Sequence, residues 1–154
     1  AGKLIGPERP GRWLDPGPFG AIGTAMGYTL AAGKAFPSDP LVVLLGDGAA
    51  GFSLMDVDSL VRHKIPATII VGNNAGWGLE RHPMRFLYGY DVLADLEPSR
   101  YDQVVEALGG AGEVVESIWE LGPALDRAMY SGVPYLVNVM TDPEVAYPRT
   151  TTGI

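Results

Sequence analysis

The chain has 154 residues, of which 47% are hydrophobic and 19% charged, a composition typical of one globular domain. Eleven basic residues against 18 acidic ones give a formal net charge of −7, which makes nucleic acid a poor partner. The absence of cysteine excludes a disulfide scaffold, a zinc–thiolate site and a cysteine nucleophile, so any metal must be held by oxygen ligands. No apolar run is long enough to span a bilayer, and we expect a cytoplasmic protein without a membrane partner.

The first third of the chain predicts a lead-in, a helix and a strand. Residues 1–19 are rich in proline and predict an irregular segment. Small residues at helical spacing predict a helix over about 20–36, with one smooth face that a backbone or a flat ligand can approach. The run LVVLL at 41–45 predicts a strand that is buried on both faces of a parallel sheet.

A βαβ unit is predicted next. After GDGAAG at 46–51, apolar residues at helical spacing predict a helix, and 65–72 predicts a second buried strand. Residues 73–98 are rich in glycine and aromatic residues and predict a long loop, of the kind that usually carries function.

The rest of the chain alternates helices and strands. We predict a helix over 99–110 with Ser99 as its N-cap, a strand over 113–117, and a helix over 117–132 with a capping box from Ser117 to Glu120. A last buried strand is predicted over 134–140. This alternation predicts an α/β fold: a three-layer α/β/α arrangement around a mostly parallel, doubly wound sheet.

Polar residues directly follow two consecutive predicted strands. Asp47 follows the first, and Asn73 and Asn74 follow the second. Because the carboxyl ends of parallel strands share one edge of the sheet, we expect these residues to lie close together. Carboxylate and amide oxygens suit Mg²⁺ or Ca²⁺ when a phosphate supplies the remaining ligands, and Gly48 and Ala49 let backbone N–H groups approach such a phosphate. The pattern therefore predicts a divalent cation that bridges Asp47 to a diphosphate.

Each half of this pattern alone is often only a turn or a loop start. Together, at neighbouring strand ends and separated by 74 − 47 = 27 residues, they form a specific signal. No Gly-Lys-Ser/Thr follows the turn, so the pattern is not a P-loop.

GDG followed after this interval by NN resembles the metal and diphosphate motif of thiamine-diphosphate enzymes. With FGAIGTAMG, GDGAAGFSLMDVDSLVRHKIP and NNAGWG in this order, the whole chain resembles the C-terminal, diphosphate-binding domain of the acetolactate synthase, benzaldehyde lyase and 2-hydroxyacyl-CoA lyase group. The resemblance implies a carboligase or lyase that acts on 2-oxo acids or 2-hydroxyacyl compounds. It also implies thiamine diphosphate and Mg²⁺ as cofactors, with 20–140 as the binding domain and 141–154 as a C-terminal tail.

The resemblance also assigns roles to residues. Asp47, the Asn74 side chain and the Gly76 carbonyl would hold Mg²⁺. Ile22 would prop the cofactor into a V shape, and it stands where the family often has Met or Leu. Ala49 stands where the family often has Ser, so a hydroxyl contact to phosphate is absent. The implied cofactor-binding set is Gly20, Ala21, Ile22, Gly46, Asp47, Gly48, Ala49, Asn74, Gly76, Trp77 and Gly78.

The resemblance places the activating glutamate in a separate pyrimidine-binding domain of the same enzyme, usually in a neighbouring subunit. No catalytic residue is therefore expected in this chain, which would be a fragment of a larger multidomain enzyme, inactive or nearly so alone, and part of a homo-oligomer. Two alternatives remain open: a non-catalytic binding module or regulatory subunit that retains the fold, and a generic magnesium–nucleotide domain. The substrate is also open.

Other residues have ordinary interpretations beside functional ones. His63 is expected to be solvated or to cap a helix, whereas His82 is either a loop histidine or faces a substrate. The Trp77 ring either floors a pocket or packs in the core. The tail YPRTTTGI at 147–154 could close over the site. Helical spacing predicts core positions for Trp119, Leu121, Leu125 and Met129.

Overall fold

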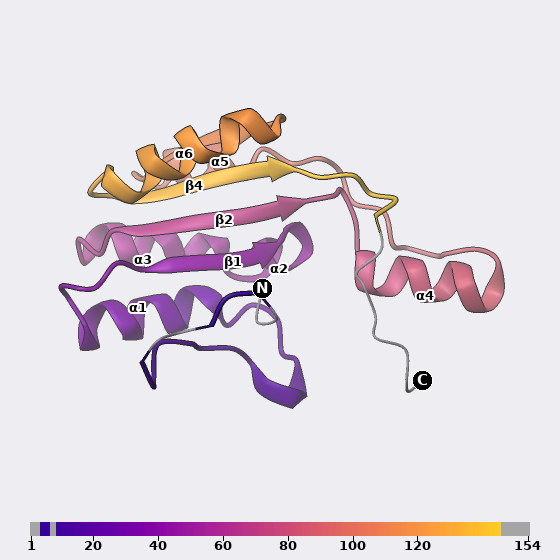
Figure 1. Ribbon diagram of the computed structural model, residues 1–154, viewed down its shortest axis with the longest axis horizontal. Coiled ribbons are helices and arrows are strands. Elements are labelled where there is room, and N and C mark those ends of the chain that lie inside the picture. Colours follow the sequence, from indigo (N-terminus) through magenta and orange to yellow (C-terminus); the bar gives the residue numbers. More distant parts are fainter. Residues whose placement is uncertain (1–3, 7–8, 146–154) are drawn as a thin grey trace.

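A computed structural model describes residues 4–6 and 9–145 (Figure 1), so the predicted tail at 147–154 lies outside the described residues. These residues form a sheet with helices on both faces. No helix among them is long and apolar enough to cross a membrane. In chain order the elements are η1 (Gly17–Phe19), α1 (Ala25–Ala35), β1 (Val42–Gly46), α2 (Asp47–Ser53), η2 (Leu54–Asp56), α3 (Val57–Arg62), β2 (Ala67–Asn73), α4 (Gly78–Tyr88), α5 (Tyr101–Ala107), β3 (Ala111–Val115), α6 (Ile118–Tyr130) and β4 (Pro134–Met140).

The described strands form one parallel sheet in the order β1-β2-β4-β3. In its register Gly46 lies opposite Gly72, so β1 and β2 end at the same edge. The predicted α/β class with a parallel sheet is confirmed.

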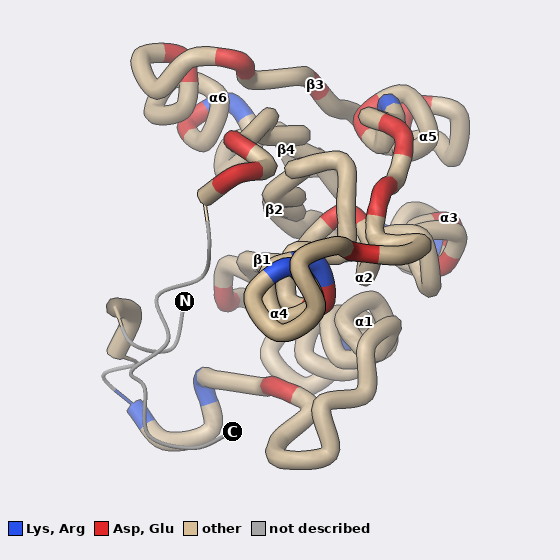
Figure 2. The backbone as a smooth tube through the Cα atoms, turned by 90° about the vertical axis from the view of Figure 1, so that its right-hand side faces the viewer, with Lys and Arg blue, Asp and Glu red and all other residues tan. Residues whose placement is uncertain are grey.

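Helices cover the two faces of the sheet unequally (Figures 1 and 2). One face packs against α1, α2, α3 and α5 through a core that includes Met26, Leu60 and Ile69. The other face packs against α6, where Ala124 and Ala128 meet Val137. The three layers predicted from the alternation are therefore present.

The first predicted helix begins later than expected. Gly20 and Gly23 have φ values of 65° and 85°, in the left-handed region that favours glycine, and α1 begins only at Ala25. The segment 20–24 is a turn, so the predicted helix start was wrong.

The predicted long loop contains a helix. Residues Gly78–Tyr88 form α4, which projects beyond the carboxyl ends of the strands (Figure 1). Pro83 lies inside this helix, where proline removes one backbone hydrogen bond and usually argues against helix formation. The loop was predicted from the glycine and aromatic residues of 73–98, which did not reveal this helix.

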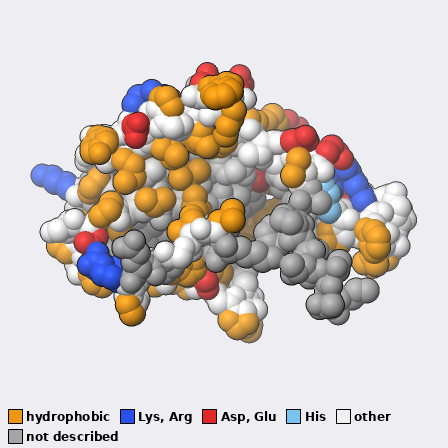
Figure 3. All heavy atoms as spheres, in the orientation of Figure 1, with side chains coloured by type: hydrophobic (Ala, Val, Ile, Leu, Met, Phe, Trp, Pro, Cys, Tyr) orange, Lys and Arg blue, Asp and Glu red, His pale blue; other side chains and the backbone are white. Residues whose placement is uncertain are grey.

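The strand β1 is not buried on both faces as predicted. Val42 and Leu44 are 54% and 42% exposed, whereas Val43 is buried. Because β1 is the edge strand and α6 packs on β2, β3 and β4, one face of β1 is not covered by α6, and Val42 and Leu44 instead line a hollow next to the lead-in. Hydrophobic side chains are visible over this face of the molecule (Figure 3).

The last helices follow the prediction in part. The capping box of Ser117 and Glu120 is present at the start of α6. By contrast, α5 begins at Tyr101 after Arg100, without a side-chain cap from Ser99. The strand β3 runs over Ala111–Val115, two residues earlier than predicted.

Two of the four predicted core positions on α6 are wrong. Trp119 is 86% exposed, and Met129 is 45% exposed although its sulfur accepts a 3.3 Å hydrogen bond from Thr68 on β2. Leu121 and Leu125 pack against the core, as predicted.

Candidate functional site

The two halves of the predicted site meet at the carboxyl edge of the sheet, which Figure 2 views with α4 in front. Asp47 is the first residue of α2, directly after β1, and only 2% of it is exposed. Its Oδ2 accepts a 2.9 Å hydrogen bond from the backbone N–H of Gly76, in the loop after β2. The sequence prediction that these strand ends lie together is confirmed.

The buried carboxylate of Asp47 lacks a cationic partner. Among the described residues no lysine, arginine or histidine forms an ion pair with it. Burial raises the pKa of Tyr101, and the negative charge of Asp47 raises it further. Burying a charge without a partner costs on the order of several kcal/mol, so this position suits a bound cation.

The oxygen donors near Asp47 fit a hard cation that also binds phosphate. No group of three His, Cys, Asp or Glu residues within the described part of the chain could hold a metal ion alone. A cation at Asp47 would therefore need further oxygen ligands, and amide, backbone carbonyl and ligand oxygens are ones that Mg²⁺ accepts. The residues around Asp47 therefore fit a divalent cation such as Mg²⁺.

Asn73, the last residue of β2, and Asn74, the next residue, differ in their contacts. Asn73 is fully buried, and its Oδ1 accepts a 3.1 Å hydrogen bond from the N–H of Ala75. Its Nδ2 donates to Asn138 Oδ1 at 3.1 Å and to the Ser99 carbonyl at 3.2 Å. Asn73 thus shapes the turn, whereas the half-buried Asn74 makes none of the side-chain hydrogen bonds found among the described residues.

Close approaches at glycine build the rest of the site. A Cβ at Gly48 would lie 2.5 Å from the Trp77 ring, and a Cβ at Gly78 would lie 2.9 Å from Asn74 Nδ2. The Trp77 ring also meets Phe52 edge-to-face, with 6.2 Å between ring centroids. Trp77 therefore packs between α2 and the loop, which favours the packing interpretation of its ring.

The turn before α1 joins the same cluster through Phe52. A Cβ at Gly23 would lie 2.9 Å from the Phe52 Cβ, so the turn lies directly against α2. Three segments that are distant in sequence, 20–23, 47–53 and 74–78, converge around this phenylalanine. The sequence analysis did not identify Phe52 as a residue of the site. Its position in α2, soon after the glycine turn, is the one sequence feature that could have indicated this role.

The remaining predicted residues lie at the margins of this cluster. Gly20 and Ala21 are exposed, and Ile22 is 46% exposed. Among the described residues, no hydrogen bond joins Ile22 to Asp47. Gly46 ends β1 and Ala49 lies half-buried in the first turn of α2.

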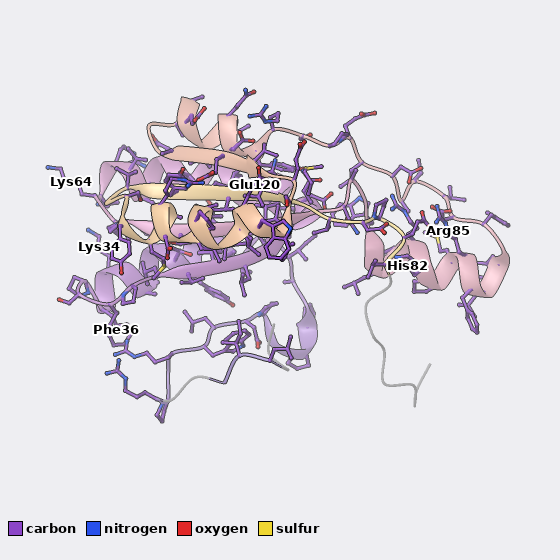
Figure 4. All side chains as sticks on the ribbon, turned by 45° about the horizontal axis from the view of Figure 1, so that its top comes forward. Lys34, Phe36, Lys64, His82, Arg85 and Glu120 are labelled. Atoms are coloured by element: carbon purple, nitrogen blue, oxygen red, sulfur yellow. The ribbon has the colours of Figure 1, made fainter. Side chains whose placement is uncertain are left out.

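The two histidines lie far apart, His63 before the start of β2 and His82 on α4 beyond the carboxyl ends of the strands. His63 is exposed after α3, as predicted. His82 lies on α4, labelled in Figure 4, and its buried Nε2 has no hydrogen-bond partner in the part of the chain that the structure describes.

Two hollows on the molecule lie away from the proposed site. The first, of about 280 Å³, lies between the lead-in, α1 and β1. The second, of about 390 Å³, lies between the lead-in, the end of α1 and the segment before β1. Neither is lined by Asp47, Asn74 or Gly76.

Known proteins are similar to this chain in sequence and in fold. The family described as thiamine pyrophosphate enzyme, C-terminal TPP binding domain, matches residues 1–139. The acetolactate synthase large subunit IlvG of Mycobacterium tuberculosis is 57% identical over 150 residues, which cover 97% of this chain and 27% of that protein. The human 2-hydroxyacyl-CoA lyase 2 is 36% identical over 146 residues, covering 91% and 23%.

A solved structure of a thiamine diphosphate-dependent enzyme has a similar fold. The thiamine diphosphate-dependent 4-hydroxybenzoylformate decarboxylase of Rhodococcus jostii matches with a TM-score of 0.75 and 26% identity, over 80% of this chain and 24% of that one. The chain spans about a quarter of the length of these proteins. Taken with the edge that carries Asp47 and Asn74, the match over residues 1–139 shows that the chain belongs to the thiamine pyrophosphate enzymes, as their C-terminal, thiamine pyrophosphate-binding domain.

Proposed function

We propose that this domain binds thiamine diphosphate through Mg²⁺ and forms one half of the active site of an acetolactate synthase-like carboligase or lyase. The observation that carries the proposal is the buried Asp47 carboxylate, which is oriented by Gly76 and lacks a cationic partner among the described residues. A divalent cation would neutralise this charge and at the same time attract a diphosphate to the start of α2.

Each residue of the site has a proposed task. Asp47, the Asn74 side chain and the Gly76 carbonyl hold Mg²⁺. Gly48 allows the backbone to approach the diphosphate, because its missing side chain leaves room beside Trp77. The full proposed set for diphosphate and aminopyrimidine is Gly20, Ala21, Ile22, Gly46, Gly48, Ala49, Trp77 and Gly78.

Bound thiamine diphosphate supplies the electron sink for making or breaking a C–C bond next to a carbonyl. The protein's part, in this chain, is to hold the metal, to bind the diphosphate and to present the cofactor to the rest of the site. The activating glutamate is proposed to come from a pyrimidine-binding domain of the same enzyme in a neighbouring subunit. The domain bounded by 20–140 would therefore work in a homo-oligomer, and the isolated chain would be inactive or nearly so.

The substrate class is proposed from similarity. Relatives include an acetolactate synthase at 57% identity, 2-hydroxyacyl-CoA lyases, and a sulfoacetaldehyde acetyltransferase at 33%. The higher identity to the acetolactate synthase favours a 2-oxo acid over an acyl-CoA substrate.

Calorimetric titration of thiamine diphosphate into the complete protein, with and without Mg²⁺, tests the proposal. We expect binding that requires Mg²⁺ and that disappears in Asp47→Ala. Binding of ATP in place of thiamine diphosphate would instead support a magnesium–nucleotide domain. Mg²⁺-dependent binding without turnover of any 2-oxo acid would support a non-catalytic module.

A further inference from the structure

A buried arginine lies behind the loop that is proposed to hold the metal. Arg81 belongs to the first turn of α4, and only 3% of it is exposed. Its Nη2 donates to the Ala75 carbonyl at 3.1 Å, to the Ala94 carbonyl at 3.4 Å and to Asp95 Oδ1 at 2.6 Å. Burial of a guanidinium costs free energy, and several specific contacts must offset this cost.

These contacts hold both neighbours of Gly76. Ala75 has a φ of 50°, in the left-handed region that disfavours alanine, and its carbonyl also accepts a 2.9 Å hydrogen bond from Leu96 N–H. The Ala94 carbonyl accepts a 2.8 Å hydrogen bond from Trp77 N–H. The guanidinium therefore joins the segment 94–96 to the residues on either side of Gly76.

Gly76 itself lies against the guanidinium. A Cβ added at this position would overlap Arg81 Nη2 and lie 2.8 Å from the Ala94 carbonyl. The N–H of Gly76 meanwhile donates to Asp47. The backbone at Gly76 is thus enclosed between Arg81 on one side and the Asp47 carboxylate on the other.

The positive charge of Arg81 is offset by carboxylates outside the proposed metal site. Asp95 Oδ1 pairs with Nη2 at 2.6 Å, and Asp91 Oδ2 lies 3.8 Å from Nε. These two carboxylates reduce the repulsion that a guanidinium would exert on a nearby divalent cation. Arg81 can therefore fix the loop without weakening its affinity for the cation.

We propose that Arg81 is a positioning residue of the metal site, which holds the 75–77 loop so that the Gly76 carbonyl and Asp47 can share one cation. This inference rests on the proposed function above. Residues that orient metal ligands typically affect metal affinity by about 10- to 100-fold when they are replaced.

The test compares two arginines on the same helix. Arg81→Met removes the contacts to the loop and retains an unbranched side chain. Arg85→Met is the control, because Arg85 is exposed on α4 (Figure 4). It shares Asp91 with Arg81 and also pairs with Glu144, but it has no hydrogen bond to the 75–77 loop among the described residues. The complete protein is titrated calorimetrically with thiamine diphosphate over a series of Mg²⁺ concentrations.

We expect Arg81→Met to raise the half-saturating Mg²⁺ concentration about tenfold or more, while saturating Mg²⁺ restores thiamine diphosphate affinity to near the wild-type value. Arg85→Met should leave the half-saturating concentration within about twofold of wild type. Arg81→Lys, which retains the charge but has a single donor atom, should give an intermediate value.

Three results would overturn the inference. These are an unchanged Mg²⁺ requirement in Arg81→Met, an equal increase in Arg85→Met, and a loss of affinity that excess Mg²⁺ does not restore, as expected if Arg81 only stabilises the fold. If Arg81→Met does not fold, the same criteria apply to Arg81→Lys. If the wild-type protein itself shows no Mg²⁺-dependent binding, the proposed function fails, which is a separate and recognisable outcome.

Discussion

The backbone N–H of Gly76 donates a 2.9 Å hydrogen bond to Oδ2 of Asp47, across 29 residues of sequence. This bond joins the end of β1 to the loop after β2 and fixes the orientation of the carboxylate. A ligand that is oriented in advance loses less conformational freedom when it binds a metal. The bond therefore prepares Asp47 for a cation while it holds the two strand ends together.

Asp47→Asn separates the charge of this residue from its hydrogen bond. The amide oxygen still accepts from Gly76 N–H, but the negative charge is lost. We expect Mg²⁺-dependent binding of thiamine diphosphate to fall by about 100-fold or more, because the proposed metal site loses the negative charge of Asp47. Without Mg²⁺, the melting temperature should be unchanged or higher, since an unpaired buried charge destabilises the fold.

The control for this prediction is Asp56→Asn, which changes an exposed carboxylate in η2. It should alter neither binding nor the melting temperature. Normal Mg²⁺-dependent binding in Asp47→Asn would show that the cation does not bind at this carboxylate. Calorimetry measures the binding, and thermal denaturation in a metal-free buffer measures the stability.

Gly48→Ala should disturb the packing of Trp77. The added Cβ would lie 2.5 Å from the indole ring, so the ring or α2 must shift. Forcing a methyl group into a packed region costs about 1–3 kcal/mol in the free energy of unfolding. Chemical denaturation measures this loss, and a second substitution, Trp77→Leu, should recover part of it by opening space.

Gly51→Ala provides the comparison on the same helix. A Cβ at Gly51 meets nothing within 4 Å, and alanine favours helix by up to about 1 kcal/mol over glycine. The free energy of unfolding should therefore stay the same or rise. Equal losses in both variants would indicate a general effect on α2 rather than contact with Trp77.

The sequence was sufficient to predict the sheet and the meeting of the two motifs. The strands follow from continuous apolar runs, and Asp47 meets the loop after β2 at Gly76 because parallel strands place their carboxyl ends at one edge. The exposure of β1 was not predictable, because an apolar run does not reveal whether its strand lies at the edge of a sheet.

Arg81 and Phe52, which contact the loop and the turn of the site, could not be predicted from the sequence. Arg81 reads as an ordinary polar residue in a loop, and its importance depends on the Ala75 and Ala94 carbonyls, which come close only in the folded chain. Phe52 is 65% exposed and meets Gly23 and Trp77 through tertiary contacts. Local sequence patterns contain no information on such contacts.

Stability should depend on pH through Asp102, a buried residue in the first turn of α5. Burial acts to raise the pKa of Asp102, but the hydrogen bonds and charge of Arg100, with a contribution from Asn138, outweigh it and hold the pKa below its usual value of 3.8. The unfolded chain then binds the proton more readily. The stabilisation is present above the ordinary pKa and is lost as the pH falls through the lowered one.

We therefore expect Asp102→Asn to be less stable than wild type at neutral pH and to lose less stability in acid. Urea denaturation from about pH 6 to about pH 3 measures both effects. Asp126→Asn, at an exposed position of α6, should follow the wild-type pH dependence. Parallel curves for wild type and Asp102→Asn would contradict the prediction.

The exposed edge of β1 should promote self-association. Val42 and Leu44 are largely exposed beside the unpaired backbone groups of an edge strand, an arrangement that favours pairing with another chain. Leu44→Lys places a charge on this edge and should shift the chain towards monomer in sedimentation velocity over a range of concentrations. Leu93→Lys is the control, because Leu93 is 94% exposed in a loop outside the sheet and its replacement should leave the association unchanged. An equal effect of both lysines would mean that exposed apolar surface in general, rather than the β1 edge, drives the association.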